Sequence, residues 1–210
     1  EYAFEGWRGP VLADVLVRLG AAAREAGPAL LPDDAPALSL SDFVRDLASK
    51  LEARRTDIAA RVRPALDRLE GVLFDTLPAW PRAFSHGDFH PLNIIWSRDG
   101  IRAVIDWEFC GPRPAMYDAA VLVGCLGMEH PRSLTGDCVV RLVGRLAAEA
   151  DYPSAAWAGF PDLVLAVRFA WLSDWLRRCD AEMVDLEAVY INLLFENRIA
   201  LLAAWGLPGG

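Results

Sequence analysis

The sequence predicts an α+β domain that is mostly helical and carries one small β-hairpin. Most of its 210 residues lie in stretches with apolar residues at helical spacing, and Asp99-Gly100 stands between two stretches rich in β-branched residues. Hydrophobic residues make up 54% and charged residues 24%, as in an ordinary to apolar globular chain, and no repeat or linker divides it. We therefore expect one domain over residues 1–210.

Helical periodicity and its stop signals predict where the other elements lie. Residues 82–85 are expected to form a short strand, 29–37 a proline-rich loop and 111–114 a rigid connection. The predicted helices cover residues 11–25, 41–61, 64–77, 116–128, 133–150, 161–178 and 181–204.

The hairpin prediction rests on the Asp-Gly turn signal. A type I′ turn needs positive φ at both central residues, which Asp-Gly tolerates. Centring the turn on Asp99-Gly100 pairs Ile95 with Val104 and Asn93 with Asp106. Directly opposed side chains lie roughly 4.5–5.5 Å apart on one face, so this register is expected to bring Asn93 and Asp106 together.

Three polar residues in this apolar segment, Asp88, Asn93 and Asp106, suit phosphoryl transfer. One group can accept a hydroxyl proton while the other two hold a divalent cation on the phosphates. Five extended residues span roughly 17 Å, so the chain must loop back after Asp88. Gly87 and Pro91 favour such a loop.

A rival interpretation makes the same segment a transition-metal site. Mixed histidine and aspartate clusters bind such ions, and His86, Asp88, His90 and Asp106 would be the ligands. This interpretation leaves Asn93 without a role.

The motif His86-Gly87-Asp88-x-x-x-x-Asn93, followed by Ile105-Asp106-Trp107-Glu108, resembles the signature of the aminoglycoside phosphotransferase and choline kinase family. That family is a branch of the protein-kinase-like fold, and the chain is similar to its C-terminal lobe. The resemblance implies that Asp88 is the catalytic base and that Asn93 and Asp106 bind Mg²⁺. It also implies that His86 braces the catalytic loop and that Asp118 supports the loop backbone.

Other candidate residues are assigned less directly. Glu108 and His90 could contact a cation or support its ligands. Trp171 and Trp175 share a helical face beside Asp174, where they could line a pocket for a cationic substrate or simply pack in the core. Residues 1–8 resemble the hinge between the two lobes of the family, with Tyr2, Ala3 and Phe4 at the adenine.

The chain also departs from the family. It has no G-x-G-x-x-G motif, and Lys50 lies on a predicted helix rather than on a strand, so we expect the N-terminal β-rich lobe to be absent. Two hypotheses remain open. The chain is either a lobe of a small-molecule kinase or a non-catalytic kinase-like binding module without the nucleotide lobe.

Composition limits the partners. The net charge of −8 argues against nucleic acid and anionic membranes, and no apolar run approaches the ~20 residues that span a bilayer. The four cysteines are widely spaced without a C-x-x-C pair, which indicates a reducing, cytoplasmic compartment. The resemblance implies ATP or GTP as co-substrate, Mg²⁺ as cofactor and a small hydroxylated acceptor, for which a cationic amine is one option.

Overall fold

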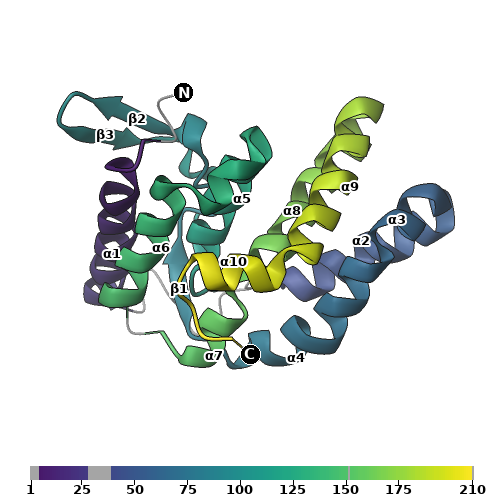
Figure 1. Ribbon diagram of the computed structural model, residues 1–210, viewed down its shortest axis with the longest axis horizontal. Coiled ribbons are helices and arrows are strands. Elements are labelled where there is room, and N and C mark those ends of the chain that lie inside the picture. Colours follow the sequence, from purple (N-terminus) through teal and green to yellow (C-terminus); the bar gives the residue numbers. More distant parts are fainter. Residues whose placement is uncertain (1–4, 28–38, 151, 210) are drawn as a thin grey trace.

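The computed structural model describes residues 5–27, 39–150 and 152–209, and shows a helical body with two small antiparallel sheets (Figure 1). The predicted hinge residues Tyr2, Ala3 and Phe4 and the predicted loop 29–37 lie outside the described residues. The helices are α1 (Arg8–Ala26), α2 (Leu40–Arg54), α3 (Thr56–Arg68), α4 (Phe74–Thr76), α5 (Tyr117–Glu129), α6 (Asp137–Glu149), α7 (Ser154–Ala158), α8 (Phe160–Arg178), α9 (Ala181–Glu196) and α10 (Arg198–Ala204). The strands are β1 (Arg82–Ser85), β2 (Ile94–Ser97), β3 (Gly100–Val104) and β4 (Gly111–Pro114).

Several predicted helix boundaries differ from those observed. The helix expected over 41–61 is broken at Arg55, and Pro64, which was expected to start or kink the next helix, lies inside α3. The helix expected over 181–204 is interrupted at Asn197, whose side chain donates to the Leu193 carbonyl at 2.8 Å. Helix α1 begins at Arg8, because Pro10 falls in the first turn, where a missing N–H costs no hydrogen bond.

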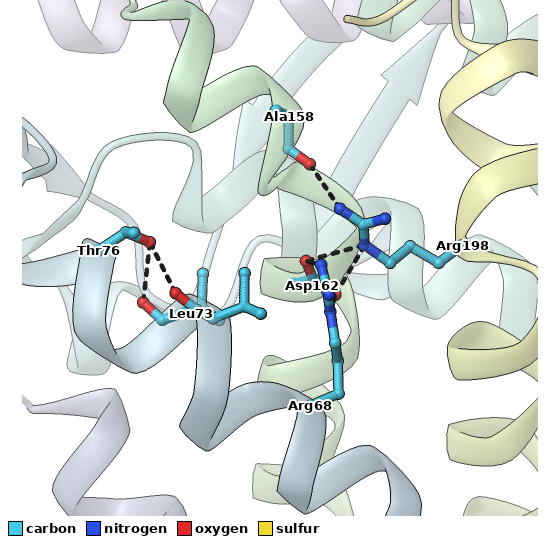
Figure 2. Close-up of polar contacts among 7 residues, drawn as sticks. Arg68, Leu73, Thr76, Ala158, Asp162 and Arg198 are labelled. Atoms are coloured by element: carbon cyan, nitrogen blue, oxygen red, sulfur yellow. Dashed lines mark hydrogen bonds and ion pairs between the residues drawn. The ribbon is translucent and has the colours of Figure 1, made fainter. Parts of the chain in front are cut away.

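Helices α5 and α8 form the centre of the body. Nearly every residue of α5 is buried, and so are the first ten residues of α8, which explains why neither shows a narrow apolar face. A buried carboxylate joins α8 to two other helices, since Asp162 accepts hydrogen bonds from Arg68 of α3 and from Arg198 of α10 (Figure 2). These ion pairs thus hold together helices that are far apart in the sequence.

One sheet pairs β1 with β4, and it leads directly to the predicted site. Arg82 pairs with Pro114 and Ser85 with Gly111, so the segment 111–114, predicted as a rigid connection, is a strand. The prolines of β4 are tolerated because this sheet has only two strands, each of them an edge. The end of β1 at Ser85 opens into the loop that carries residues 86–93.

The second sheet is the predicted hairpin, but its register differs from the predicted one by two residues next to the turn and by one residue beyond the β-bulge. Ile94 pairs with Val104 and Ser97 with Gly100, so the turn consists of Arg98-Asp99 rather than Asp99-Gly100. The Ser97 hydroxyl donates to the Gly100 carbonyl at 3.1 Å, which closes the turn one residue earlier. The strand pairing also shifts between Ile95 and Trp96, where there is a β-bulge. A prediction that assumes strict alternation of side chains along a strand cannot locate such a bulge.

Two further features concern membrane-spanning helices and the cysteines. Within the described ranges, no helix is long and apolar enough to cross a membrane. None of the four cysteines, all of which are described, is in a disulfide, and burial raises the pKa of Cys125 and of Cys138 to about 11.

Candidate active site

Asp118 anchors the loop that follows β1. Its carboxylate, in the first turn of α5, accepts the backbone N–H of His86 at 2.6 Å and that of Gly87 at 2.9 Å. Burial raises the pKa of Asp118, although these two donors oppose the rise. The loop backbone is therefore bonded to a side chain more than 30 residues away.

His86 connects this loop to the segment that carries Asp106. Its Nδ1 accepts the N–H of Asp88 at 3.2 Å, so Nε2 carries the proton and donates to the Ile105 carbonyl at 2.9 Å. The imidazole is fully buried and packs edge-on against Trp107, with the ring centroids 4.5 Å apart. These contacts join the loop to the segment that leads to Asp106. The bracing role of His86 stays a prediction.

Gly87 allows the loop to approach the segment after Asp106. Its φ is +86°, and a Cβ built on it would lie 2.2 Å from the Phe109 carbonyl oxygen. The same carbonyl accepts a hydrogen bond from Arg113 of β4 at 2.8 Å. Only glycine fits here, because a side chain would meet rigid backbone as well as adopt a strained φ.

Asp88, His90 and Asn93 lie together at the mouth of this loop. The Asn93 Nδ2 donates to the Asp88 carbonyl at 2.9 Å and to Asp88 Oδ2 at 3.2 Å, and His90 Nε2 lies 3.4 Å from the same Oδ2. Burial alone would raise the pKa of Asp88, but the hydrogen bonds from His90 and Asn93 outweigh it and lower that pKa. Asp88 is therefore a half-buried carboxylate held in place by two donors.

Asp106 is not opposite Asn93, as the predicted register would have placed it. The Ile105 N–H donates to the Asn93 carbonyl at 3.0 Å, so Asn93 faces Ile105 rather than Asp106. Asp106 then adopts a left-handed conformation, with φ 68° and ψ 62°, and turns the chain into a 3₁₀ turn. Its side chain and that of Glu108 are both exposed. The direction of the chain at Asp106 is thus set by this left-handed turn and not by the strand register.

The donor set suits a hard cation. Both oxygens of Asp88 and its carbonyl are acceptors, so the amide group that faces them must be the NH₂ of Asn93, which leaves Asn93 Oδ1 for a ligand. An amide oxygen with the carboxylate of Asp106 is the kind of pair that Mg²⁺ prefers. The described residues contain no group of three or more histidine, cysteine, aspartate or glutamate side chains arranged to hold a metal, which counts against the transition-metal interpretation.

The predicted substrate residues on α8 contact the protein's own cations. The Arg168 guanidinium lies 4.5 Å from the Trp171 ring centroid, and that of Arg178 lies 5.4 Å from Trp175. Asp174 pairs with Arg177 and with Arg178. A cationic substrate at this place would have to displace arginine, so these residues remain a prediction.

Two supporting groups were missed by the sequence reasoning. The Ile105 carbonyl is the partner of His86, and Arg113 holds the Phe109 carbonyl against Gly87. No sequence signal marks a backbone carbonyl, whereas an arginine between two prolines directly after the motif was a usable hint for Arg113.

The comparisons with known proteins concern the family and the fold of the chain. The model of the phosphotransferase enzyme family (APH) matches residues 8–158, whereas no curated protein matches the sequence. An amicoumacin kinase, hAmiN, solved with AMP-PNP, Ca²⁺ and Ami, is similar at TM-score 0.60 and 14% identity over 94% of this chain and 61% of that one. The GDP complex of aminoglycoside 2′-phosphotransferase-IIIa is similar at TM-score 0.60 and 14% identity over 92% of this chain and 64% of that one.

These structures show the fold, and the present chain spans about three fifths of their length. The similarity covers nearly the whole of this chain, including the helical body and both small sheets, so the expected kinase-like C-terminal lobe is confirmed. Since the family model covers well over half of the sequence, the chain belongs to the phosphotransferase enzyme family.

Proposed function

We propose that this chain supplies the base and the cation-binding half of a small-molecule kinase, which transfers the γ-phosphoryl group of ATP or GTP to a substrate hydroxyl. The observation that carries the proposal is the arrangement of Asp88 and Asn93. A partly buried carboxylate with a lowered pKa is fixed by the amide that would bind the cation, on a loop that Asp118 holds from α5.

Asp88 acts as the base in this proposal. Its Oδ2 is engaged by Asn93 and His90, so Oδ1 is the oxygen that would accept the proton of the acceptor hydroxyl. Its lowered pKa keeps the group ionised at neutral pH. Asp88 would accelerate the reaction more by orienting the hydroxyl than by removing its proton, because phosphoryl transfer depends mainly on positioning and charge neutralisation.

Asn93 and Asp106 would hold Mg²⁺ through Asn93 Oδ1 and the Asp106 carboxylate. The cation, when bound, neutralises negative charge on the transferring phosphoryl group. The chain fixes Asn93 through its bonds to Asp88, and it fixes the peptide before Asp106 through His86. Glu108, exposed two residues further on, is a candidate for a second cation.

The face of the hairpin next to these ligands suits the nucleotide base. Ile95 and Ile105 lie on one face by the observed register, and each is 43% exposed. Exposed aliphatic side chains beside a cation site offer a flat apolar surface for a purine ring. A reaction that consumes a nucleoside triphosphate is also compatible with the expected cytoplasmic location.

The test is a phosphoryl-transfer screen of the full-length protein with Mg²⁺, ATP or GTP, and a panel of hydroxylated amines and sugars. We expect turnover of at least one acceptor and a loss of roughly 100-fold or more in Asp88→Asn. Asp99→Asn is the matched control, since Asp99 is an exposed aspartate in the hairpin turn. Turnover above about a tenth of wild type in Asp88→Asn would exclude Asp88 as the base.

The same screen addresses the alternative of a non-catalytic binding module. A module would bind nucleotide or acceptor without turnover, and Asp88→Asn would leave its affinity unchanged. Binding measured by calorimetry in parallel with turnover therefore separates the two functions.

A further inference from the structure

An arginine at the start of α1 contacts the hairpin that follows Asn93. Arg8 is the first residue of α1, and only 7% of its surface is exposed. Its guanidinium carbon lies 4.1 Å from the ring centroid of Trp96 on β2 and 5.1 Å from that of Trp7. The two indoles meet edge to face, 5.6 Å apart at 81°.

Glu5 completes this cluster from the preceding loop. Its Oε2 accepts Trp7 Nε1 at 3.1 Å and Arg8 Nε at 3.3 Å, so one carboxylate orients both the indole and the guanidinium. A planar cation stacked on an indole and removed from water is held strongly, and a lysine ammonium does not reproduce the planar stacking. We call Glu5, Trp7, Arg8 and Trp96 the tryptophan clamp.

The clamp attaches the hairpin to the helical body. In Figure 1 the hairpin β2–β3 lies over the end of α1 where Arg8 is located. Helix α1 is itself tightly packed on α6, because a Cβ on Gly9 would lie 2.2 Å from the Cys138 carbonyl oxygen. Arg8 thus lies between a fixed helix pair and the strand that begins directly after Asn93.

The two sides of the candidate site have different anchors on the helical body. Asp88 lies on the loop that Asp118 anchors to α5, whereas Asn93 and Asp106 lie at the open end of the hairpin. The hairpin contacts the loop through His86 and contacts α1 through Trp96. Because Asn93 also bonds directly to Asp88, a shift of the hairpin would strain these bonds and change where the two cation ligands lie relative to Asp88.

We propose that Arg8 is a positioning residue for phosphoryl transfer: through Trp96 it fixes the hairpin, and with it Asn93 and Asp106, relative to Asp88. The inference rests on the proposed function, and it adds a positioning residue that lies outside the family motif. It predicts a larger defect in cation use than in acceptor binding, because the clamp contacts the hairpin, whereas the backbone of the loop that carries Asp88 has its own anchor at Asp118.

The test compares Arg8→Met with Arg145→Met in the full-length protein. Arg145 of α6 pairs with Asp14 of α1 at 3.0 Å, so the control removes an arginine from the same helix pair without touching the hairpin. In Arg8→Met we expect the Mg²⁺ concentration for half-maximal rate to rise about tenfold and kcat to fall about tenfold, since small misplacements of reacting groups are costly. The KM of the acceptor should stay within about twofold of wild type.

A second readout does not require activity. Amide hydrogen exchange over residues 94–104 should accelerate at least about tenfold in Arg8→Met and not in Arg145→Met, because local opening of the hairpin would cost less. Arg8→Lys should exchange like Arg8→Met, since the planar stacking is lost. Unchanged hairpin exchange in Arg8→Met overturns the clamp whatever the activity. Absent turnover in the wild type, with accelerated exchange in Arg8→Met, overturns the proposed function but leaves the clamp intact.

Discussion

The helical body and the candidate site satisfy their buried charges in different ways. In the body, buried charges form ion pairs with side chains of opposite charge. Arg168 and Glu187 are almost fully buried and form two hydrogen bonds of 2.7 Å. Asp162 likewise pairs with Arg68 and with Arg198. At the site, Asp118 is satisfied by backbone N–H groups, and Asp88 by an amide and an imidazole.

The difference indicates which charges are available to a ligand. An ion pair neutralises both of its partners, so Arg168 and Glu187 have no remaining charge to offer. A carboxylate bound by neutral donors keeps its negative charge and is still oriented. The carboxylates of the site therefore keep a negative charge that a ligand can use, whereas the buried charges of the body are neutralised. Three substitutions and one labelling experiment can break or sharpen this comparison.

The largest loss of stability is expected in the body. Arg168→Met leaves Glu187 buried without a counter-charge, which should lower the free energy of unfolding by about 3–5 kcal/mol. The pKa of Arg168, which burial alone would lower, is instead held above its usual value by Glu187, so the pair is charged in the native state. Urea unfolding measures the loss.

The double variant Arg168→Met/Glu187→Leu is the control for this prediction. It removes both charges and should recover most of the lost stability, because well-packed apolar side chains can replace a buried ion pair. A double variant no more stable than Arg168→Met would show that packing, and not the unpaired charge, accounts for the loss.

Gly87→Ala is expected to have the next largest effect on stability. A positive φ costs a non-glycine residue about 1–2 kcal/mol, and the overlap with the Phe109 carbonyl adds about 1–3 kcal/mol. Turnover should fall with it, because the loop that carries Asp88 must move. Gly71→Ala is a matched control, since nothing lies within 4 Å of a Cβ built there. Equal thermal stability of the two variants would contradict the prediction.

A smaller loss is expected for Asp118→Asn. The amide keeps one acceptor oxygen and loses the other, so one of the two backbone N–H groups is orphaned at a cost of about 1–2 kcal/mol. Hydrogen exchange should show the destabilisation around residues 86–88 rather than throughout α5. Uniformly faster exchange over the whole chain would instead indicate that Asp118 stabilises the fold globally.

The smallest effect concerns the thiols and needs no substitution. Cys110 and Cys179 are exposed, whereas burial raises the pKa of Cys125 and of Cys138 to about 11. At pH 8 only about a thousandth of each buried thiol would be ionised, so alkylation should stop at two labels in the native protein and reach four in denaturant. Peptide mass spectrometry identifies the labelled cysteines, and rapid native labelling of Cys125 would show that the body opens readily.

Much of the architecture could be predicted because its signals are local. The apolar spacing located the helices around α5, α6 and α8, and the turn residues located the hairpin. The breaks at Arg55 and Asn197 were missed, since each interrupts a pattern that continues on both sides. The strand β4 was missed because its partner β1 lies about 30 residues earlier and its prolines argue against a strand.

Only some of the contacts within the site could be predicted from the sequence. Asp88, Asn93 and His86 lie in one short loop, and the structure places Asp88 and Asn93 in direct contact. The expected pairing of Asn93 with Asp106 is wrong by one residue, because the Ser97 hydroxyl closes the turn early and a bulge follows at Trp96. Asp106 is instead redirected by its left-handed backbone, which a period-two pattern cannot anticipate.

By itself, the sequence determined the family and the candidate chemistry, because the residue types and spacings of the motif are read along one short segment. Only the tertiary structure decided how those residues are held: by Asp118 from α5, by the Ile105 carbonyl through His86, and by the contact of Arg8 with Trp96. The physical reason is that each of these contacts joins segments far apart in the chain, whose proximity depends on how the helices pack rather than on any local pattern.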